Sequence, residues 1–385
     1  MEHIIIIGGG GTGGALAHDL ALRGFKVTLF EKGGLVSGTT GRHHGLLHSG
    51  ARYAMHDPIA AQKCIQENRI LKRIAPDAIE SNGGLFIALD SRDLDYRQAF
   101  LDGCATCGIP AIEIDPDKAL ALEPGLHPAI KTAIQVPDAT MDAWRLPMHF
   151  FATARANGAN IHPFSEITAI HSRAGAITGV RVIELKTHRE SDVQGDLVIN
   201  CAGPWAGKVA ALAGLTVPIQ PGPGVMVAID GRLSNMVINR LHPAGEGDII
   251  VPQRRLSILG TSAWLETDPD TIHLPKEQIG EMIKLCAEML PAISQHPVHS
   301  AWHAVRPLIV DDAADNPMAI SRTFNCYDHG EIGNLEGMIS VIGGKATTLR
   351  AMAEKTADLI CRKTGTDIPC KTRETKLLNY RAYFK

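Results

Sequence analysis

The first thirty-one residues show a pattern of strand, turn, helix and strand. Four consecutive isoleucines, residues 4–7, form an unbroken apolar run of the kind found in parallel strands that are buried on both faces. A glycine-rich turn follows, residues 15–22 continue as an apolar helix, and residues 27–30 form a second apolar run. Gly24 stands where it can end the helix. This order predicts the βαβ unit that opens a doubly wound α/β sheet.

The turn between strand and helix has the glycine spacing of a dinucleotide site. Gly8, Gly10 and Gly13 fit the G-x-G-x-x-G pattern. The first glycine permits the tight turn, the second lets a pyrophosphate approach the backbone, and the third lets the helix pack close to the strand. The second strand ends at Glu31, whose carboxylate can accept hydrogen bonds from ribose hydroxyls. We therefore predict that this unit binds a dinucleotide.

Residues 37–53 indicate which dinucleotide is bound. The segment combines glycines, hydroxyl side chains and several basic or titratable residues. Such a loop can wrap a pyrophosphate and reach a flavin ring, whereas an NAD domain would normally continue into another crossover helix. The segment favours FAD. A polar surface loop without a ligand is the alternative interpretation.

The remaining pattern predicts two interleaved domains. Short apolar strands and amphipathic helices alternate along the chain, and residues 216–321 contain strands separated by glycine and proline turns. We predict an α/β fold in which a Rossmann-like FAD-binding domain is interleaved with an α+β substrate domain that has an antiparallel sheet. The FAD-binding domain comprises residues 1–82, 142–215 and 322–385, and the substrate domain comprises residues 83–141 and 216–321. A substrate is expected at their interface.

Charge, apolar runs and cysteine content limit the possible partners and the cellular location. The formal net charge is -3 and there is no long basic run, which argues against nucleic acid as a partner. Because the first strand begins at residue 4 and no apolar run reaches bilayer length, we expect a cytoplasmic protein without a signal peptide. Eight cysteines then indicate a reducing compartment. Cys104 and Cys107 form a C-x-x-C pair, for which packing is favoured over redox chemistry; we predict no metal site.

Several segments resemble a known family. Residues 40–53, 68–74 and 82–87 are similar to the FAD-dependent glycerol-3-phosphate dehydrogenases, most closely to the flavin subunit of the anaerobic, three-subunit enzyme. The resemblance runs from residue 4 to about Thr372. It implies an FAD-binding domain of the D-amino-acid-oxidase and glutathione-reductase type, and oxidation of a small phosphorylated polyol, sn-glycerol 3-phosphate, to dihydroxyacetone phosphate.

The resemblance also implies an electron acceptor other than NAD. Electrons would pass to a quinone or to partner subunits, with possible peripheral association at the cytoplasmic face of the inner membrane. The anaerobic flavin subunit has a further C-terminal cysteine-rich region, thought to hold an iron-sulfur cluster, and the sequence has no counterpart of it. A different electron partner and direct quinone reduction at the membrane surface are therefore both open.

The resemblance extends the expected cofactor contacts to two later turns. Residues 200–206 are similar to the family's second glycine turn, although a plain strand-to-helix turn is the alternative. Residues 343–345 start the last helix, where backbone N–H groups can stabilise negative charge on a reduced flavin. The predicted FAD-binding residues are Gly8, Gly10, Thr12, Gly13, Glu31, Lys32, Thr39, Thr40, Gly41, Arg42, Leu46, His48, Ser49, Ile167, Ala202, Gly203, Trp205, Gly343, Gly344, Lys345, Ala346 and Thr347.

Cations from distant segments are the predicted substrate contacts. By resemblance, the substrate is surrounded by Arg52, Tyr53, Arg306, Arg322 and Lys345. Independently of the family, several cations that converge at one cleft would suit a dianionic phosphate, because a guanidinium can pair with two oxygens at once. Each cation taken alone could instead form a surface ion pair. Lys345 could serve either the flavin or the substrate.

Alcohol oxidation needs a base for the hydroxyl proton. His48 is the first candidate because it lies in the segment expected to pass the flavin ring, and a cofactor-positioning role is equally open. His303, three residues before Arg306, is the second candidate, and the catalytic set is His48, His303, Arg306 and Lys345. His303, Ala304 and His43 depart from residues usual in the family, which puts the substrate in doubt more than the reaction.

Three other functions remain open from the sequence. The fold could oxidise another polyol phosphate or a 2-hydroxy acid. It could also be an amine or amino-acid oxidase of the wider superfamily, although a monoanionic substrate would not need so many cations. A FAD-containing electron-transfer subunit without a substrate of its own is the third alternative, and the intact set of cations argues against it.

Overall fold

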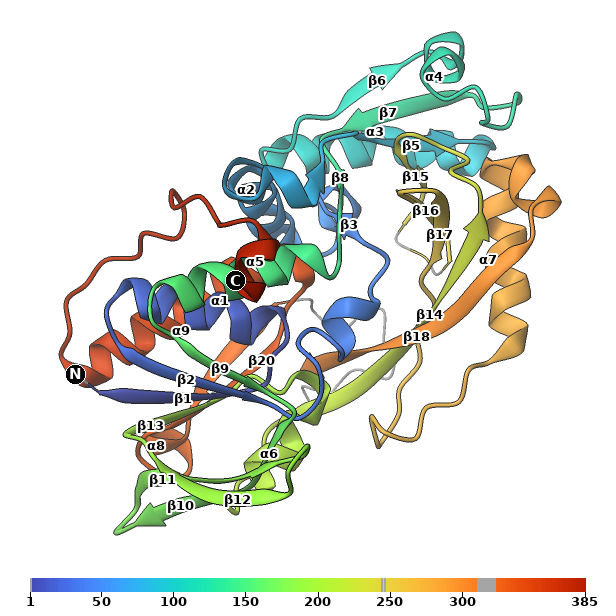
Figure 1. The fold of residues 1–385 in the computed structure, drawn as a ribbon. Coiled ribbons are helices and arrows are strands. Elements are labelled where there is room, and N and C mark those ends of the chain that lie inside the picture. The colour runs from blue at the N-terminus through green and yellow to red at the C-terminus, as the bar shows by residue number, and fades with distance from the viewer. Residues whose placement is uncertain (1, 244, 246, 310–322) are drawn as a thin grey trace.

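The chain opens with the predicted βαβ unit (Figure 1). The computed structural model describes residues 2–243, 245, 247–309 and 323–385. Strand β1 (His3–Ile7) is followed by helix α1 (Gly11–Leu22) and strand β2 (Lys26–Glu31). β1 pairs in parallel with β2 on one side and with β13 (Leu197–Asn200) on the other. Ile4 to Ile6 are fully buried because both faces of the strand are covered, which explains the unbroken apolar run.

The first sheet has six strands in the order β19-β20-β13-β1-β2-β9. Helices α1, α5 and α9 lie on one of its faces (Figure 1), and their apolar residues share one core with β1 and β2. On the other face, β10 and β11 of a three-stranded sheet pack against Ile5, Ile7 and Phe30. The elements not yet placed are β9 (Asn160–Pro163), β20 (Met338–Gly343), β19 (Phe324–Asp328), helices α5 (Arg145–Ala156) and α9 (Leu349–Thr364), and strands β10 (Ser165–Arg173), β11 (Ala176–Glu184) and β12 (Arg189–Gln194).

The second sheet has eight strands in the order β18-β14-β17-β16-β15-β5-β7-β6. Every neighbouring pair is antiparallel except β15 and β5. One face packs against helix α7 (Lys276–Met289), and the opposite face packs against Leu46. The strands are β5 (Gly84–Ala88), β6 (Ile112–Ile114), β7 (Thr132–Val136), β14 (Ile219–Asp230), β15 (Val237–Arg240), β16 (Ile249–Gln253), β17 (Leu256–Gly260) and β18 (Val298–Ile309).

A small sheet has three short strands in the order β3-β8-β4. Strand β8 (Ala139–Met141) pairs with both β3 (Leu46–Leu47) and β4 (Ile79–Glu80). Strand β8 follows β7 closely, and the two strands are separated by Pro137 and Asp138. Proline has no N–H to donate to a ladder, and the Asp138 carboxylate accepts a hydrogen bond from the Ser49 N–H at 2.6 Å.

Aspartate side chains accept backbone N–H groups at the starts of two helices. Asp57 precedes α2 and its carboxylate accepts from the Ala60 N–H at 3.1 Å, and Asp142 accepts from the Arg145 N–H at 2.8 Å at the start of α5. The remaining helices are α2 (Pro58–Ile74), α3 (Ser91–Thr106), α4 (Pro116–Leu122), α6 (Ala206–Ala211) and α8 (His329–Ile332).

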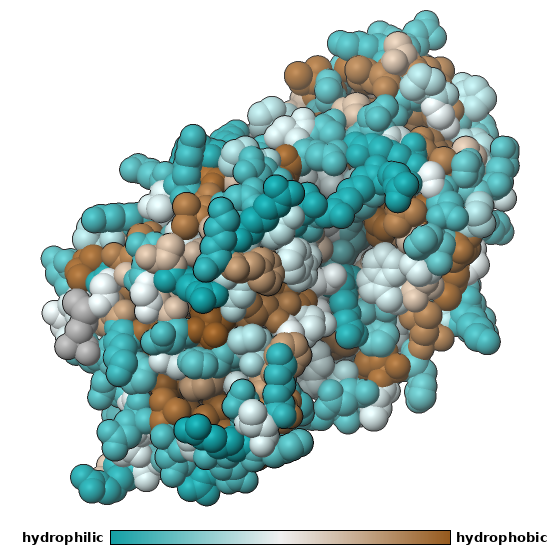
Figure 2. Space-filling model, in the orientation of Figure 1, coloured by the Kyte–Doolittle hydropathy of each residue, from teal (hydrophilic) through white to brown (hydrophobic). Residues whose placement is uncertain are grey.

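The predicted fold class is confirmed: a parallel Rossmann-like sheet accompanies a separate and largely antiparallel one. The division into domains at the predicted boundaries stays a prediction, and the boundary at 321/322 lies next to residues outside the described ranges. Hydrophilic side chains cover most of the face shown in Figure 2, and hydrophobic residues appear there in small groups. Within the described residues, no helix combines the length and the apolar character needed to cross a membrane.

A candidate dinucleotide and substrate site

The three glycines of the turn after β1 have different surroundings. A Cβ on Gly8 would lie 2.5 Å from the Cys201 carbonyl oxygen, and one on Gly13 would lie 2.0 Å from the Gly8 carbonyl oxygen. Around Gly10 a Cβ would meet one described atom within 4 Å, the Oγ1 of Thr40 at 3.1 Å. The first and third glycines therefore allow close backbone packing, and Gly10 borders the open space that a pyrophosphate needs.

The start of α1 is open to an anion. Gly10 is the N-cap residue of α1, and no side chain provides a cap hydrogen bond there. The Gly11 N–H donates to Thr40 Oγ1 at 3.0 Å. The loop with Thr39 and Thr40 therefore crosses the beginning of the helix, which also contains Thr12. The loop is closed by a bond from the Gly41 N–H to the Val36 carbonyl at 3.0 Å. Backbone N–H groups at such a helix start bind phosphate oxygens. These residues fit the pyrophosphate of a dinucleotide.

The acidic end of β2 is held in place by two backbone groups. Glu31 Oε2 accepts from the Gly9 N–H and Oε1 accepts from the Gly33 N–H, both at 2.6 Å. Each carboxylate oxygen keeps capacity for another donor, so ribose hydroxyls can still bind. Lys32 instead forms an exposed ion pair with Glu166 at 2.8 Å, and Ile167 is buried beside β2.

The second turn lies directly beside the first. Because β13 neighbours β1, Cys201 contacts Gly8, and the next residues, Ala202 and Gly203, follow along the same edge. Trp205 directly precedes α6; its ring lies near Gly38, and its indole N–H donates to Asp270 at 2.7 Å. This placement is consistent with the predicted cofactor contacts of Ala202 and Gly203.

The third turn joins β20 to α9. Gly343 and Gly344 adopt positive φ angles of 89° and 82°, and the chain then forms a short 3-10 turn, Ala346–Thr348, before α9. Thr347 Oγ1 accepts a hydrogen bond from the His48 N–H at 3.2 Å. This bond brings the predicted flavin-binding turn next to the segment that contains His48 and Ser49.

Three histidines near this point are held neutral. Burial lowers the pKa of His43 to about 4 and, with the charges of His43, Arg306 and Arg52, the pKa of His44 to about 3. His43 Nδ1 and His44 Nδ1 each accept a backbone N–H, from Gly45 and Leu46, so neither ring carries a proton on that nitrogen. Burial, followed by the charges of His44, Lys345 and Arg52, lowers the pKa of His48 well below its usual value.

The predicted substrate cations converge on these histidines. The Lys345 ammonium lies 4.4 Å from the centre of the Tyr53 ring, and the Tyr53 and His48 rings are 5.2 Å apart. Arg52 is buried one residue before Tyr53 and influences both His44 and His48. Lys345, Arg52, Tyr53 and His48 therefore form one cluster.

Arg306 belongs to the same neighbourhood, but its fork is largely occupied. The guanidinium donates to the carbonyls of Gly222, Pro223 and Ser262 at 3.0–3.2 Å and to Thr261 Oγ1 at 3.0 Å. A Cβ on Gly224 would lie 2.7 Å from Arg306 Nη2, so glycine makes room for it. Arg306 thus supplies positive charge from a fixed position on β18.

His303 points the other way from Arg306. In β18, His303 pairs with Val225, whose side chain packs with α7, whereas Ala304 packs with Leu46 on the opposite face of the sheet. Side chains alternate along a strand, so His303 and Arg306 occupy different faces. His303 therefore lies on the α7 side of the sheet. Arg322, the remaining predicted substrate residue, lies outside the described residues.

Sequence reasoning missed two residues that contact this cluster. Asp248 pairs with Arg52, and His242 Nε2 lies 3.1 Å from Asp248 Oδ2. They lie about 190 residues beyond Arg52, and no local motif marked either one. A buried aspartate just before an apolar strand was the one available signal.

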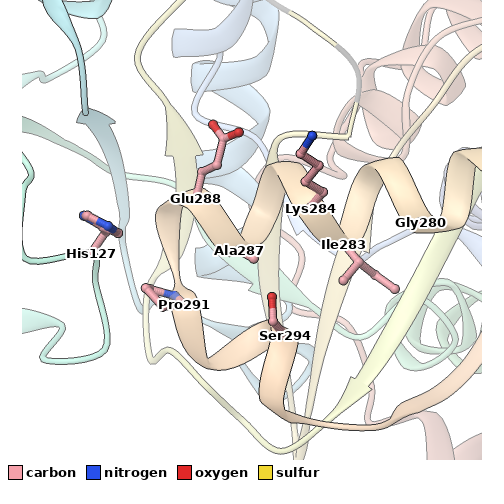
Figure 3. A pocket seen from close by; sticks show the side chains of 8 residues that line it. All are labelled: His127, Gly280, Ile283, Lys284, Ala287, Glu288, Pro291 and Ser294. Carbon is pink, nitrogen blue, oxygen red and sulfur yellow. The ribbon is translucent and has the colours of Figure 1, made fainter.

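A surface pocket elsewhere is not part of this site. A hollow of about 510 Å³ lies beside α7, and Figure 3 shows the side chains that line it. It contains none of the predicted site residues and lies on the α7 side of the sheet, opposite Leu46. Its lining residues are His127, Gly280, Ile283, Lys284, Ala287, Glu288, Pro291 and Ser294.

The two cysteines of the C-x-x-C pair pack in the core as free thiols. Cys104 and Cys107 are free and buried, and burial raises the pKa of both thiols, that of Cys104 to about 12. Such thiols are poor nucleophiles and poor metal ligands. Within the described ranges, no group of three or more histidine, cysteine or carboxylate side chains could hold a metal ion.

Comparison with known proteins identifies the family. The family model described as FAD dependent oxidoreductase matches residues 3–359. The chain is 40% identical, over 385 residues, to subunit A1 of the anaerobic glycerol-3-phosphate dehydrogenase of Haloferax volcanii, covering 97% of this chain and 66% of that protein. The chain thus spans about two thirds of that relative's length. This similarity confirms the resemblance to the anaerobic flavin subunit.

Solved structures share the fold without deciding the substrate. The glycerol-3-phosphate dehydrogenase of Bacillus halodurans, solved with FAD, superimposes with a TM-score of 0.75 at 21% identity, covering 98% of this chain and 68% of that chain. Glycine oxidase of Bacillus cereus gives 0.76 at 22% identity, covering 94% and 98%. The predicted cofactor, FAD, agrees with the family match and with the geometry of the glycine turn. Because the family model covers residues 3–359, the chain belongs to the FAD-dependent oxidoreductase family.

Proposed function

We propose that this chain oxidises sn-glycerol 3-phosphate to dihydroxyacetone phosphate with FAD as its cofactor. The proposal rests on one observation: Arg52, Lys345 and Arg306 converge beside buried, neutral histidines next to the turns suited to FAD. Clustered cations in a partly buried site suit a dianionic phosphate. The 40% identity to an anaerobic glycerol-3-phosphate dehydrogenase subunit supports the same substrate.

Residues from three turns would hold the cofactor. When bound, FAD supplies the acceptor for the hydride that leaves the alcohol carbon. The start of α1 with Thr40 would bind the pyrophosphate, and Glu31 would bind the ribose. The backbone at Gly343 and Gly344 would face the flavin edge that becomes negative on reduction.

His48 is proposed as the base for the substrate hydroxyl. Its pKa lies well below the usual value because the residue is buried and has cationic neighbours, so the imidazole is neutral and can accept a proton. A dianionic phosphate beside Arg52 and Lys345 would offset those charges and raise the pKa of His48 toward neutrality. Substrate binding would thus make His48 a stronger base.

We also propose that electrons leave for a quinone or for partner subunits. The relative's name describes a subunit of a larger enzyme, and this chain spans 66% of that subunit. Peripheral association with the cytoplasmic face of the inner membrane would bring the chain close to a quinone pool. The check is whether substrate-reduced protein is reoxidised by a soluble quinone analogue, and whether it co-sediments with anionic lipid vesicles.

An anaerobic absorption spectrum tests the substrate. The purified protein with FAD is recorded at the flavin band before and after addition of sn-glycerol 3-phosphate. Glycerol, 2-hydroxyglutarate and glycine serve as comparators for the polyol, hydroxy-acid and amine alternatives. We expect bleaching with the phosphate alone. A flavin that stays oxidised with the phosphate but bleaches with a comparator would refute the proposed substrate and identify the correct class.

A further inference from the structure

The Arg52 guanidinium is buried with one nitrogen unused. Its side chain is 7% exposed, and Nη2 donates to the Gly245 carbonyl at 2.7 Å and to Asp248 Oδ1. Nη1 is buried and has no hydrogen-bond partner among the residues that the structure describes. An unpaired buried guanidinium nitrogen is costly, so its presence indicates an acceptor that arrives from outside the protein.

Asp248 lies between two cations. Its other oxygen, Oδ2, lies 3.1 Å from His242 Nε2, and His242 Nδ1 lies 2.6 Å from the Pro243 carbonyl oxygen. Nδ1 has the Pro243 carbonyl as its partner, and Nε2 lies within ion-pair distance of Asp248 Oδ2, so a protonated His242 ring would pair with this carboxylate. Burial opposes this charge, but the hydrogen bond and charge of Asp248 raise the pKa of His242 above its usual value.

The segment that contains Asp248 is fixed to the Arg306 site. The Gly247 N–H donates to the Thr261 carbonyl at 3.1 Å, and Thr261 Oγ1 accepts from Arg306 Nη2 at 3.0 Å. On its other side, the Gly247 carbonyl accepts from the Cys286 thiol of α7 at 3.1 Å. Asp248 is therefore held at a defined position relative to both arginines.

We propose that Asp248 and His242 are positioning residues that set the specificity for a phosphorylated substrate. Asp248 holds Nη2 of Arg52, so that Nη1 faces the substrate phosphate, and His242 fixes the second carboxylate oxygen. The inference rests on the proposed function, which supplies the phosphate. It assigns the selectivity for phosphate to a triad of Arg52, Asp248 and His242.

The first test separates the effects of Asp248 on KM and on kcat. Asp248→Asn keeps the size of the side chain and removes its charge. We expect the KM for sn-glycerol 3-phosphate to rise about tenfold, because the phosphate-binding arginine is misaligned. The kcat at saturating sn-glycerol 3-phosphate and the FAD content should change far less than the KM, because Asp248 orients the phosphate-binding arginine and does not touch the reacting carbon. A fall in kcat as large as the rise in KM, or loss of FAD, would show a merely structural role.

A matched pair on the surface provides the control. Asp230 and His299 form an aspartate–histidine pair at 2.8 Å, with side chains 47% and 54% exposed. Asp230→Asn should leave both kinetic constants unchanged. At the site, His242→Gln keeps a donor toward Asp248 and should keep most of the affinity, whereas His242→Ala should not. Indistinguishable Gln and Ala variants would overturn the role of His242.

Chemical rescue tests the link between Asp248 and Arg52. Arg52→Ala leaves a space that added guanidinium can fill, and we expect guanidinium to restore turnover while Asp248 is intact. The double variant Arg52→Ala/Asp248→Asn should not be rescued. Equal rescue in both backgrounds would contradict the proposed orientation by Asp248.

Binding of inorganic phosphate separates this inference from the proposed function. If wild-type protein is not reduced by sn-glycerol 3-phosphate, the proposed function fails. Calorimetric binding of inorganic phosphate that weakens in Asp248→Asn would still support the positioning role for an anion. Phosphate binding that is equal in wild type and Asp248→Asn would overturn the inference alone, whatever the substrate.

Discussion

His18 in α1 is a buried histidine without a polar partner. Neither ring nitrogen has a hydrogen bond within the described structure, and the ring meets the edge of Phe150 at 5.7 Å between centres. Burial lowers the pKa of His18 from 6.5 to about 4. Between these values the unfolded chain binds a proton that the folded chain does not, so the contribution of His18 to stability falls as the pH falls.

His18→Leu should remove this acid sensitivity. Urea unfolding at pH 7 and pH 5 measures it: the wild type should lose about 2 kcal/mol more than the variant between the two values. His273→Leu, at an exposed position, is the control and should follow the wild type. Identical pH dependence in His18→Leu and wild type would mean that burial of the imidazole has no such effect.

The proposed base predicts a pH profile. A base acts while it is unprotonated, and the pKa of His48 is lowered, so the acid limb of kcat/KM should lie below pH 6.5. His48→Gln should reduce kcat by about 10²- to 10⁴-fold and retain FAD. The pH profile of kcat/KM and the flavin content are the measurements. If the variant loses FAD instead, His48 positions the cofactor.

Single residues also mark the limit of sequence reasoning at the site. Gly8, Gly10 and Glu31 were predictable because their spacing within one βαβ unit is fixed by the ligand. Asp248 and His242 were not, because their partner Arg52 lies far away in sequence and contact depends on the tertiary fold. The face of the sheet that His303 occupies was not predictable for a related reason, because the register of its strand decides it.

At the scale of elements, regular patterns can be predicted from the sequence, whereas polar or interrupted ones cannot. Helix α2 begins after Asp57, which caps it, and Pro58 stands in its first turn. Strand β12 (Arg189–Gln194) was not predictable, because its residues are almost all exposed and no alternation of apolar and polar residues marks it. The strand before Arg306 extends through it to Ile309, since pairing with β14 continues across Pro307.

A buried ion-pair network joins three elements. Arg350 of α9 is 1% exposed and donates to both carboxylate oxygens of Glu67 in α2, to Glu354, and to Thr372 of the C-terminal segment at 3.0 Å. Removing one partner of a buried pair leaves an uncompensated charge. The network therefore fixes α2 and the C-terminal segment against α9.

Arg350→Ala should destabilise the fold by about 3–5 kcal/mol. The double variant Arg350→Met/Glu67→Met should recover a large part, because no buried charge is left unpaired. Denaturant unfolding of the three proteins gives the comparison. Arg373→Ala, which breaks an ion pair of Glu354 at an exposed position, is the control. A double variant as unstable as Arg350→Ala would argue that packing rather than charge dominates.

At the scale of the whole molecule, the loop after β2 connects the two large sheets. Thr39 Oγ1 donates to the Val305 carbonyl at 2.6 Å, and the Trp302 indole N–H donates to the Arg42 carbonyl at 2.6 Å. Leu46 packs with Met226 and Ala304. The segment expected to wrap the cofactor is therefore bonded to β18, which also contains Arg306, so cofactor binding and substrate binding share one structural support.

FAD should accordingly stabilise the molecule as one unit. A ligand that binds the folded state alone adds about 2.7 kcal/mol at one hundred times its Kd, and the bonds from Thr39 and Arg42 to β18 should extend this effect to both sheets. Glu31→Ala removes the ribose acceptor, so the same FAD concentration should raise its unfolding midpoint less. Thermal unfolding across an FAD titration measures the shift in midpoint. Each protein is compared with its own FAD-free midpoint, because Glu31→Ala also loses stability directly when the bonds to the Gly9 and Gly33 N–H groups are removed. An equal FAD-dependent shift in wild type and Glu31→Ala would exclude Glu31 from the cofactor site, and two separate transitions in the wild type would show that β18 does not couple the sheets.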